Sequence, residues 1–183
     1  MTSVVVMVKR KSAEPVVVCF IIKADEGVNS MLDSNYIVGF VDGEGCFSIT
    51  INKNGSKLPE VRLIFEIELR EDDEAILKEI KAILGCGNIY RLDYKRYDKW
   101  RPHVKYKVSN FSDISEQIIP FFRAHPLQAK KRLQFERFCK VAEMMRHKEH
   151  LTQKGIAEIE SIRRRDSLDA LDTHVQWGAI ETT

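Results

Sequence analysis

The chain lacks the patterns that mark several large classes of protein. Its longest apolar run, residues 16–22, is far shorter than the roughly 20 residues needed to span a bilayer. The four cysteines are scattered, with no C-x-x-C pair and no histidine pair at zinc-finger spacing, which argues against a zinc site. Near the N-terminus, basic residues follow a short apolar stretch, which is not the order of a secretory signal. We therefore expect an intracellular protein, in the cytoplasm or an organelle matrix.

Net charge is also small, at +2 over 183 residues, but it is unevenly distributed. Segment 87–107 holds seven Lys or Arg and two acids, and segment 123–148 holds eight and two. Segment 60–79 reverses the balance, with eight acids and three basic residues. Clustered basic charge beside aromatic residues is typical of a nucleic-acid-binding surface. On charge alone, solvated hairpin and helix faces explain the pattern equally well.

Periodicity predicts one α+β domain. Asp33 or Ser34 is a good N-cap for a helix that runs to about Val41. Residues 46–70 read as two alternating strands joined by a turn, residues 71–84 as an amphipathic helix, and 88–110 as a second hairpin. Helices follow over 111–122 and about 128–147, and Thr152 caps a last one. The order is αββαββα plus C-terminal helices, which predicts an antiparallel sheet with helices on one face.

The chain divides into three parts in this interpretation. Residues 1–30 form an N-terminal extension of uncertain structure, because two β-branched runs are separated there by a charged segment. Residues 31–168 form the domain. Residues 169–183 form a weakly patterned tail.

One stretch, "IVGFVDGEG" over residues 37–45, combines a helical apolar pattern with glycines and two acids. With the segments "FEIELREDDEAILKEIKAILGCGNIY" and "FFRAHPLQAKKRLQF", it resembles the LAGLIDADG homing endonucleases over residues 32–165. The resemblance implies the αββαββα fold of that family, with a saddle-shaped antiparallel sheet.

Gly39 lies in the middle of the predicted helix, where glycine costs about 1 kcal/mol relative to alanine. That cost makes sense if another backbone must approach closely. In the family this helix packs against its counterpart, so the resemblance assigns Ile37, Gly39 and Phe40 to a dimer interface. A single motif per chain implies a homodimer on a long, nearly palindromic double-stranded DNA target.

The resemblance also assigns the catalytic groups. It makes Glu44 a ligand of Mg²⁺ (or Mn²⁺), assisted by the backbone carbonyl of Gly43, where many relatives carry Asp. Asp42 is expected to cap or brace the helix end. The family places a lysine near the start of its later basic helix, and the sequence leaves two candidates, Lys131 and Lys130, with Lys131 slightly favoured.

Alternation along the strands predicts a polar sheet face that would lie in the major groove of DNA. Side chains from all four strands belong to this DNA-binding face. They are Cys46, Ser48, Thr50, Asn52, Asn54, Arg62, Glu66, Glu68, Arg70, Tyr90, Arg96, His103, Lys105 and Lys107.

The leading hypothesis is thus a site-specific, divalent-metal-dependent DNA endonuclease. An alternative is a non-cleaving relative that serves as an intron RNA splicing maturase or as a DNA-binding regulator. A third hypothesis is a structural α+β domain in which the motif occurs by chance. Such a protein is expected to be a monomer with no affinity for DNA.

Overall fold

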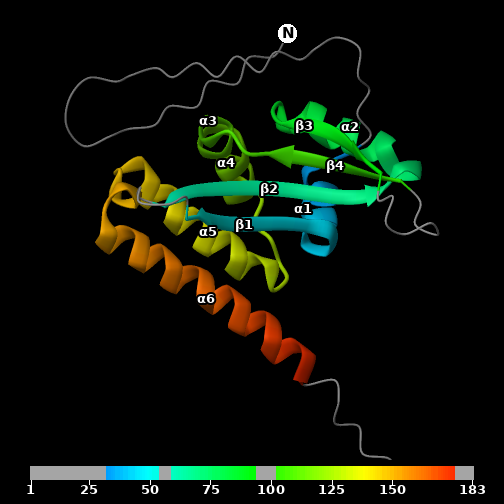
Figure 1. Cartoon of the computed structure of the whole chain (residues 1–183). Helices are drawn as coiled ribbons and strands as arrows, with labels where there is room; N and C mark the ends of the chain where they lie inside the picture. The colour runs from blue at the N-terminus through cyan, green and yellow to red at the C-terminus, as the bar shows by residue number, and fades with distance from the viewer. Residues whose placement is uncertain (1–31, 54–58, 94–101, 176–183) are drawn as a thin grey trace, which may run out of the picture.

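A computed structural model describes residues 32–53, 59–93 and 102–175 (Figure 1). The strands are β1 (Gly45–Asn52), β2 (Glu60–Arg70), β3 (Asn88–Leu92) and β4 (His103–Val108). The helices are α1 (Ser34–Glu44), α2 (Glu74–Leu84), α3 (Phe111–Asp113), α4 (Ile119–Ala124), α5 (Lys131–Arg146) and α6 (Gln153–Val175). In this part of the chain no helix is both long and apolar enough to cross a membrane.

The strands form one antiparallel sheet in the order β1-β2-β4-β3, which confirms the predicted architecture. Alternate residues of β1, β2 and β4 are buried on one face of this sheet, against the helices. At the centre, the ring of Phe47 lies 4.9 Å from that of Phe65, 5.5 Å from Phe122 and 5.1 Å from Phe135. These contacts join β1 and β2 to α4 and α5, so helices far along the chain hold the first hairpin in place.

Helix α1 begins as predicted and ends later. The Asp33 carboxylate accepts a hydrogen bond from the backbone N–H of Tyr36 at 2.7 Å, which confirms it as the N-cap. The helix continues to Glu44, three residues beyond the predicted end. Gly45 follows, and a Cβ atom there would lie 2.6 Å from Val41 Cγ1 and 2.9 Å from Val41 O. Only glycine allows the chain to pass from α1 into β1 so close to the last helical turn.

The helix predicted over 111–122 is less regular than its pattern. A π-helical segment, Ile114–Ile118, separates α3 from α4. Pro120 stands in the first turn of α4, and it has no N–H to donate to a carbonyl one turn earlier. A π-turn before this proline lets the helical path continue.

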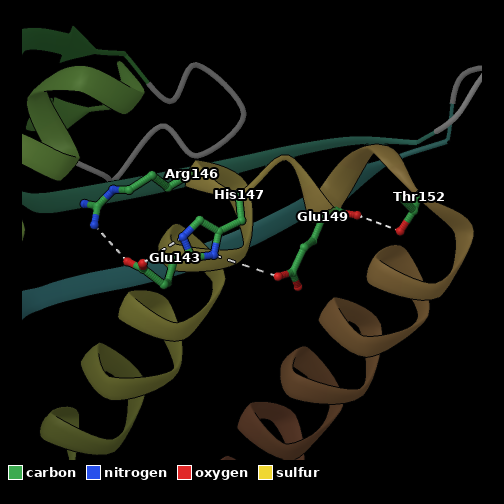
Figure 2. A network of polar contacts seen from close by, with 5 residues as sticks. All are labelled: Glu143, Arg146, His147, Glu149 and Thr152. Atoms are coloured by element: carbon green, nitrogen blue, oxygen red, sulfur yellow. Dashed lines mark hydrogen bonds and ion pairs between the residues drawn. The ribbon is translucent and has the colours of Figure 1, made fainter.

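The turn from α5 to α6 is held by polar contacts around one histidine (Figure 2). His147 lies 3.4 Å from Glu143 and 3.9 Å from Glu149, and Arg146 pairs with Glu143 at 2.8 Å. Thr152 Oγ1 accepts the N–H of Gly155 at 3.0 Å, which confirms the predicted cap. Helix α6 runs to Val175, so the predicted boundary at residue 168 falls inside a helix.

Candidate active site and nucleic-acid interface

The C-terminal end of α1 brings together the two kinds of group predicted for catalysis. Glu44 is the last residue of the helix, and its side chain is exposed. Lys131, the first residue of α5, is half-buried, and its Nζ donates to the Gly43 carbonyl at 3.3 Å and also to the Gly45 carbonyl. Because the last carbonyls of a helix carry partial negative charge, this ammonium group is held electrostatically. Lys130 is exposed, so the structure separates the two candidate lysines by their surroundings.

Asp42 braces α5 and not its own helix end. Its Oδ2 accepts the backbone N–H of Gln128 at 2.8 Å and that of Ala129 at 3.2 Å. These groups stand just before α5, where helical N–H groups lack partners within the helix. One carboxylate thus anchors the segment that leads directly into Lys131.

The exposed face of α1 differs from the predicted interface at one residue. Ile37 has no exposed surface and belongs to the subunit's own core, with Val38 and Val41, so its assignment to a dimer interface is wrong. Helical geometry explains this, because residues 37 and 41 share one side of the helix. Gly39 is exposed, and Phe40, whose ring stacks on that of Tyr36 with centroids 6.0 Å apart, is half-buried.

Both glycines of α1, Gly39 in the middle and Gly43 near the end, face open space. A Cβ atom at Gly39 or at Gly43 would meet nothing within 4 Å. The absence of side chains at these positions therefore serves no packing contact within the described part of the subunit.

Beside this face lies an open groove of about 740 Å³ between α1, the end of β2 and the start of α2. Leu32, Phe40, Leu69 and Ile76 give it an apolar side. Its lining also carries acidic residues, among them both Glu44 and Glu68. The sequence did not predict this groove, because its walls come from separate elements.

The polar face of the sheet is arranged in rows across the strands. Cys46 pairs with Glu66 and Glu66 with Lys107, while Glu68 pairs with Lys105 and Lys105 with Tyr90. Further along, Thr50 pairs with Arg62, and at the other end Arg70 pairs with His103. Ser48 and Asn52 lie on this face too, whereas Asn54 and Arg96 fall outside the described residues. Ile64 interrupts the polar surface opposite Ser48.

Three charged side chains form a compact cluster on this face. Lys105 Nζ lies 2.9 Å from Glu68 Oε2 and 3.5 Å from Glu66 Oε2, and each of the three side chains is less than one-third exposed. Burial lowers the pKa of Lys105, but the hydrogen bonds and charges of Glu68 and Glu66 outweigh it and raise the pKa. The lysine stays protonated, and the cluster carries a net negative charge when both acids are ionised.

The oxygen donors at the end of α1 fit a hard divalent cation such as Mg²⁺ or Mn²⁺ in chemical type. Glu44 offers an exposed carboxylate, and the Gly43 carbonyl keeps one lone pair beside its bond to Lys131. Among the described residues, no three His, Cys, Asp or Glu side chains gather as a metal site. At this helix end, the described residues thus offer the Glu44 carboxylate and the Gly43 carbonyl as candidate ligands.

Comparison with known proteins gives consistent results. The family model described as "LAGLIDADG endonuclease" matches residues 37–142. A Neurospora crassa protein named "Probable intron-encoded endonuclease 3" is 32% identical over 140 residues, covering 75% of this chain and 25% of the relative. The chain thus spans about a quarter of that relative's length.

Two solved structures share the fold. The meganuclease I-SmaMI, bound to uncleaved DNA in the presence of calcium ions, is 32% identical with a TM-score of 0.64, covering 72% of this chain and 43% of that one. The homing endonuclease I-TnaI is 29% identical with a TM-score of 0.65, covering 73% of this chain and 87% of that one. The family match, the shared fold and the motif at the end of α1 agree: this chain belongs to the LAGLIDADG endonuclease family.

Proposed function

We propose that the protein is a site-specific double-strand DNA endonuclease that works as a homodimer and requires a divalent metal ion. The observation that carries this proposal is that Lys131 binds the backbone carbonyls of Gly43 and Gly45, on either side of Glu44, where α1 ends and β1 begins. Together with a divalent cation, an acid, a held ammonium group and a surface for DNA would supply what such a reaction needs. The relatives named as endonucleases and the DNA complex of I-SmaMI support the same reading.

The homodimer is supported by the exposed face of α1. Gly39 and Gly43 lie four residues apart on it with open space above them. Small residues at this spacing let two helices approach closely. Packing α1 against a second α1 would cover Tyr36 and Phe40 and bring two copies of Glu44 together, completing the ligand set that one chain lacks.

In phosphodiester hydrolysis these residues would have different roles. Glu44, with the Gly43 carbonyl, would hold Mg²⁺ or Mn²⁺, which supplies Lewis-acid activation of water and phosphate when bound. Lys131 lies at the same helix end, where its ammonium group can order water and offset the charge that develops on the phosphate. The polar sheet face would lie in the major groove, and the two-fold axis would favour a nearly palindromic target.

The test compares Glu44→Gln with the wild type on host-gene DNA from which the intron has been removed. The variant is expected to bind this DNA with unchanged affinity in calcium and to lose cleavage in magnesium. Glu158→Gln is the matched control, because Glu158 of α6 pairs with Lys140, which lies further along α5 from the site than Lys131. Cleavage by Glu44→Gln at the control's rate would refute the site. Binding without cutting by the wild type would favour a maturase or regulator.

A further inference from the structure

Glu66 and Glu68 are unusual groups for a surface that meets DNA. A carboxylate near phosphates weakens binding, and the other basic residues on this face provide the attraction. The ion pairs with Lys105 do not by themselves explain why two acids stand on this face, since partly exposed pairs contribute no more than about 1 kcal/mol to folding. A role in base recognition explains the two acids on the polar sheet face better than a role in folding does.

Base edges limit what a carboxylate can bind. In the major groove the only donors are the amino groups of cytosine N4 and adenine N6. Adenine presents N7, an acceptor, beside its amino group, and this atom repels a carboxylate. Cytosine has no such neighbour, and its partner guanine presents the acceptors O6 and N7. The edge of a C·G pair thus offers a donor next to acceptors.

The cluster has the complementary arrangement. A carboxylate oxygen of Glu68 and the ammonium of Lys105 stand 2.9 Å apart on neighbouring strands. The carboxylate would accept from cytosine N4 while the ammonium donates to the guanine beside it. Because both acids hold the lysine, the side chains are ordered before DNA arrives, which lowers the entropic cost of binding.

We infer that Glu66 and Glu68, oriented by Lys105, are specificity-determining residues that select C·G base pairs in each half of the target. The inference rests on the proposed function. Residues two apart on a strand are separated by about 6.8 Å, which matches about two base pairs at a rise of 3.4 Å. Two cytosine preferences about two base pairs apart therefore occur in each half-site. The base pair selected by Glu68 lies nearer the centre of the target, because Glu68 lines the same groove as Glu44, which would stand beside the two-fold axis.

The experiment selects binding sites from a randomised double-stranded DNA library in calcium, with the full chain. Wild type, Glu66→Gln, Glu68→Gln and the control Glu158→Gln are compared. Glutamine makes paired contacts with adenine N6 and N7. Each sheet variant is therefore expected to lose one cytosine and gain adenine at that position alone, with about a 5- to 150-fold change in preference.

Unchanged base preferences at the other positions of the selected DNA would show that a variant is folded and binds in the same orientation. Selected sequences that keep both cytosines in Glu66→Gln and Glu68→Gln would overturn the inference, and so would a wild-type site without them. These outcomes leave the proposed function intact, because sequence-selective binding would still be seen. Failure of the wild type to enrich any sequence would overturn the proposed function together with the inference.

Discussion

Replacing Asp42 with alanine tests whether one brace both stabilises the fold and positions Lys131, the proposed catalytic lysine. The change removes an acceptor that serves the N–H groups of Gln128 and Ala129, at 2.8 and 3.2 Å. Both residues are exposed, so water replaces part of the lost bonding. The loss of a helix cap, about 1 kcal/mol, is the appropriate scale. For a chain of this size it lowers Tm by about 2–4 °C.

The effect on cleavage is expected to exceed the effect on stability. Without the brace, the segment before α5 no longer fixes the position of Lys131 at the start of the helix. Small displacements of a catalytic group cost up to about 100-fold in rate. We expect single-turnover cleavage by Asp42→Ala to fall about 10- to 100-fold while its DNA affinity changes little. Asp42→Asn keeps an acceptor oxygen and should recover most of the rate.

Asp33→Ala is the matched control for this prediction. Asp33 caps the other end of α1 through one hydrogen bond of 2.7 Å, far from Lys131. It should lower Tm by a similar amount and leave cleavage unchanged. The assays are thermal unfolding at one protein concentration, DNA binding in calcium and single-turnover cleavage in magnesium. Equal cleavage rates for Asp42→Ala and Asp33→Ala would refute a positioning role for Asp42.

Three further substitutions probe the α1 face, the α1–β1 junction and the core. Gly39→Leu should fold but run as a monomer in light scattering, because its side chain enters the open face where the second helix would pack; a stable dimer would contradict this. Gly45→Ala should destabilise the protein by about 1–3 kcal/mol in denaturant unfolding, since its Cβ would overlap Val41; unchanged stability would refute the steric argument. Tyr106→Phe loses a 3.0 Å hydrogen bond to the Cys86 carbonyl and should unfold about 1 kcal/mol more easily at neutral pH. Burial raises the pKa of Tyr106, so its contribution is present below the pKa of an unfolded tyrosine and is lost as pH rises. The variant's Tm should therefore fall less than that of the wild type between about pH 9 and 11.

The sequence predicted the elements that depend on local patterns. The alternation in β1 and β2, the cap at Asp33 and the cap at Thr152 each involve residues close in the chain, and all three are observed. The end of α1 was placed too early because Gly43 suggested a stop, although the helix continues to Glu44. A glycine inside a helix weakens it without ending it when the flanking residues are packed.

Contacts between distant segments could not be predicted in this way. Ile37 was assigned to the interface by its place in the motif, although its position relative to Val41 puts it on the buried side. The choice between Lys130 and Lys131 depends on how α5 meets the end of α1, and nothing in "AKKR" encodes it. Asp42 was expected to act locally, but its partners are 86 and 87 residues away. The predicted roles in metal, DNA and partner binding stay predictions.

The position of Glu44 has an evolutionary consequence. A carboxylate on the last turn of a helix interacts unfavourably with the helix dipole, and this destabilises the fold by about 0.3–1 kcal/mol. A neutral residue at position 44 would make the protein slightly more stable while abolishing the proposed cleavage. Selection for folding alone would thus not preserve the proposed nuclease activity. If the proposed cleavage brings no advantage, one mutation at this position would leave a stable protein whose proposed DNA-binding face is unchanged.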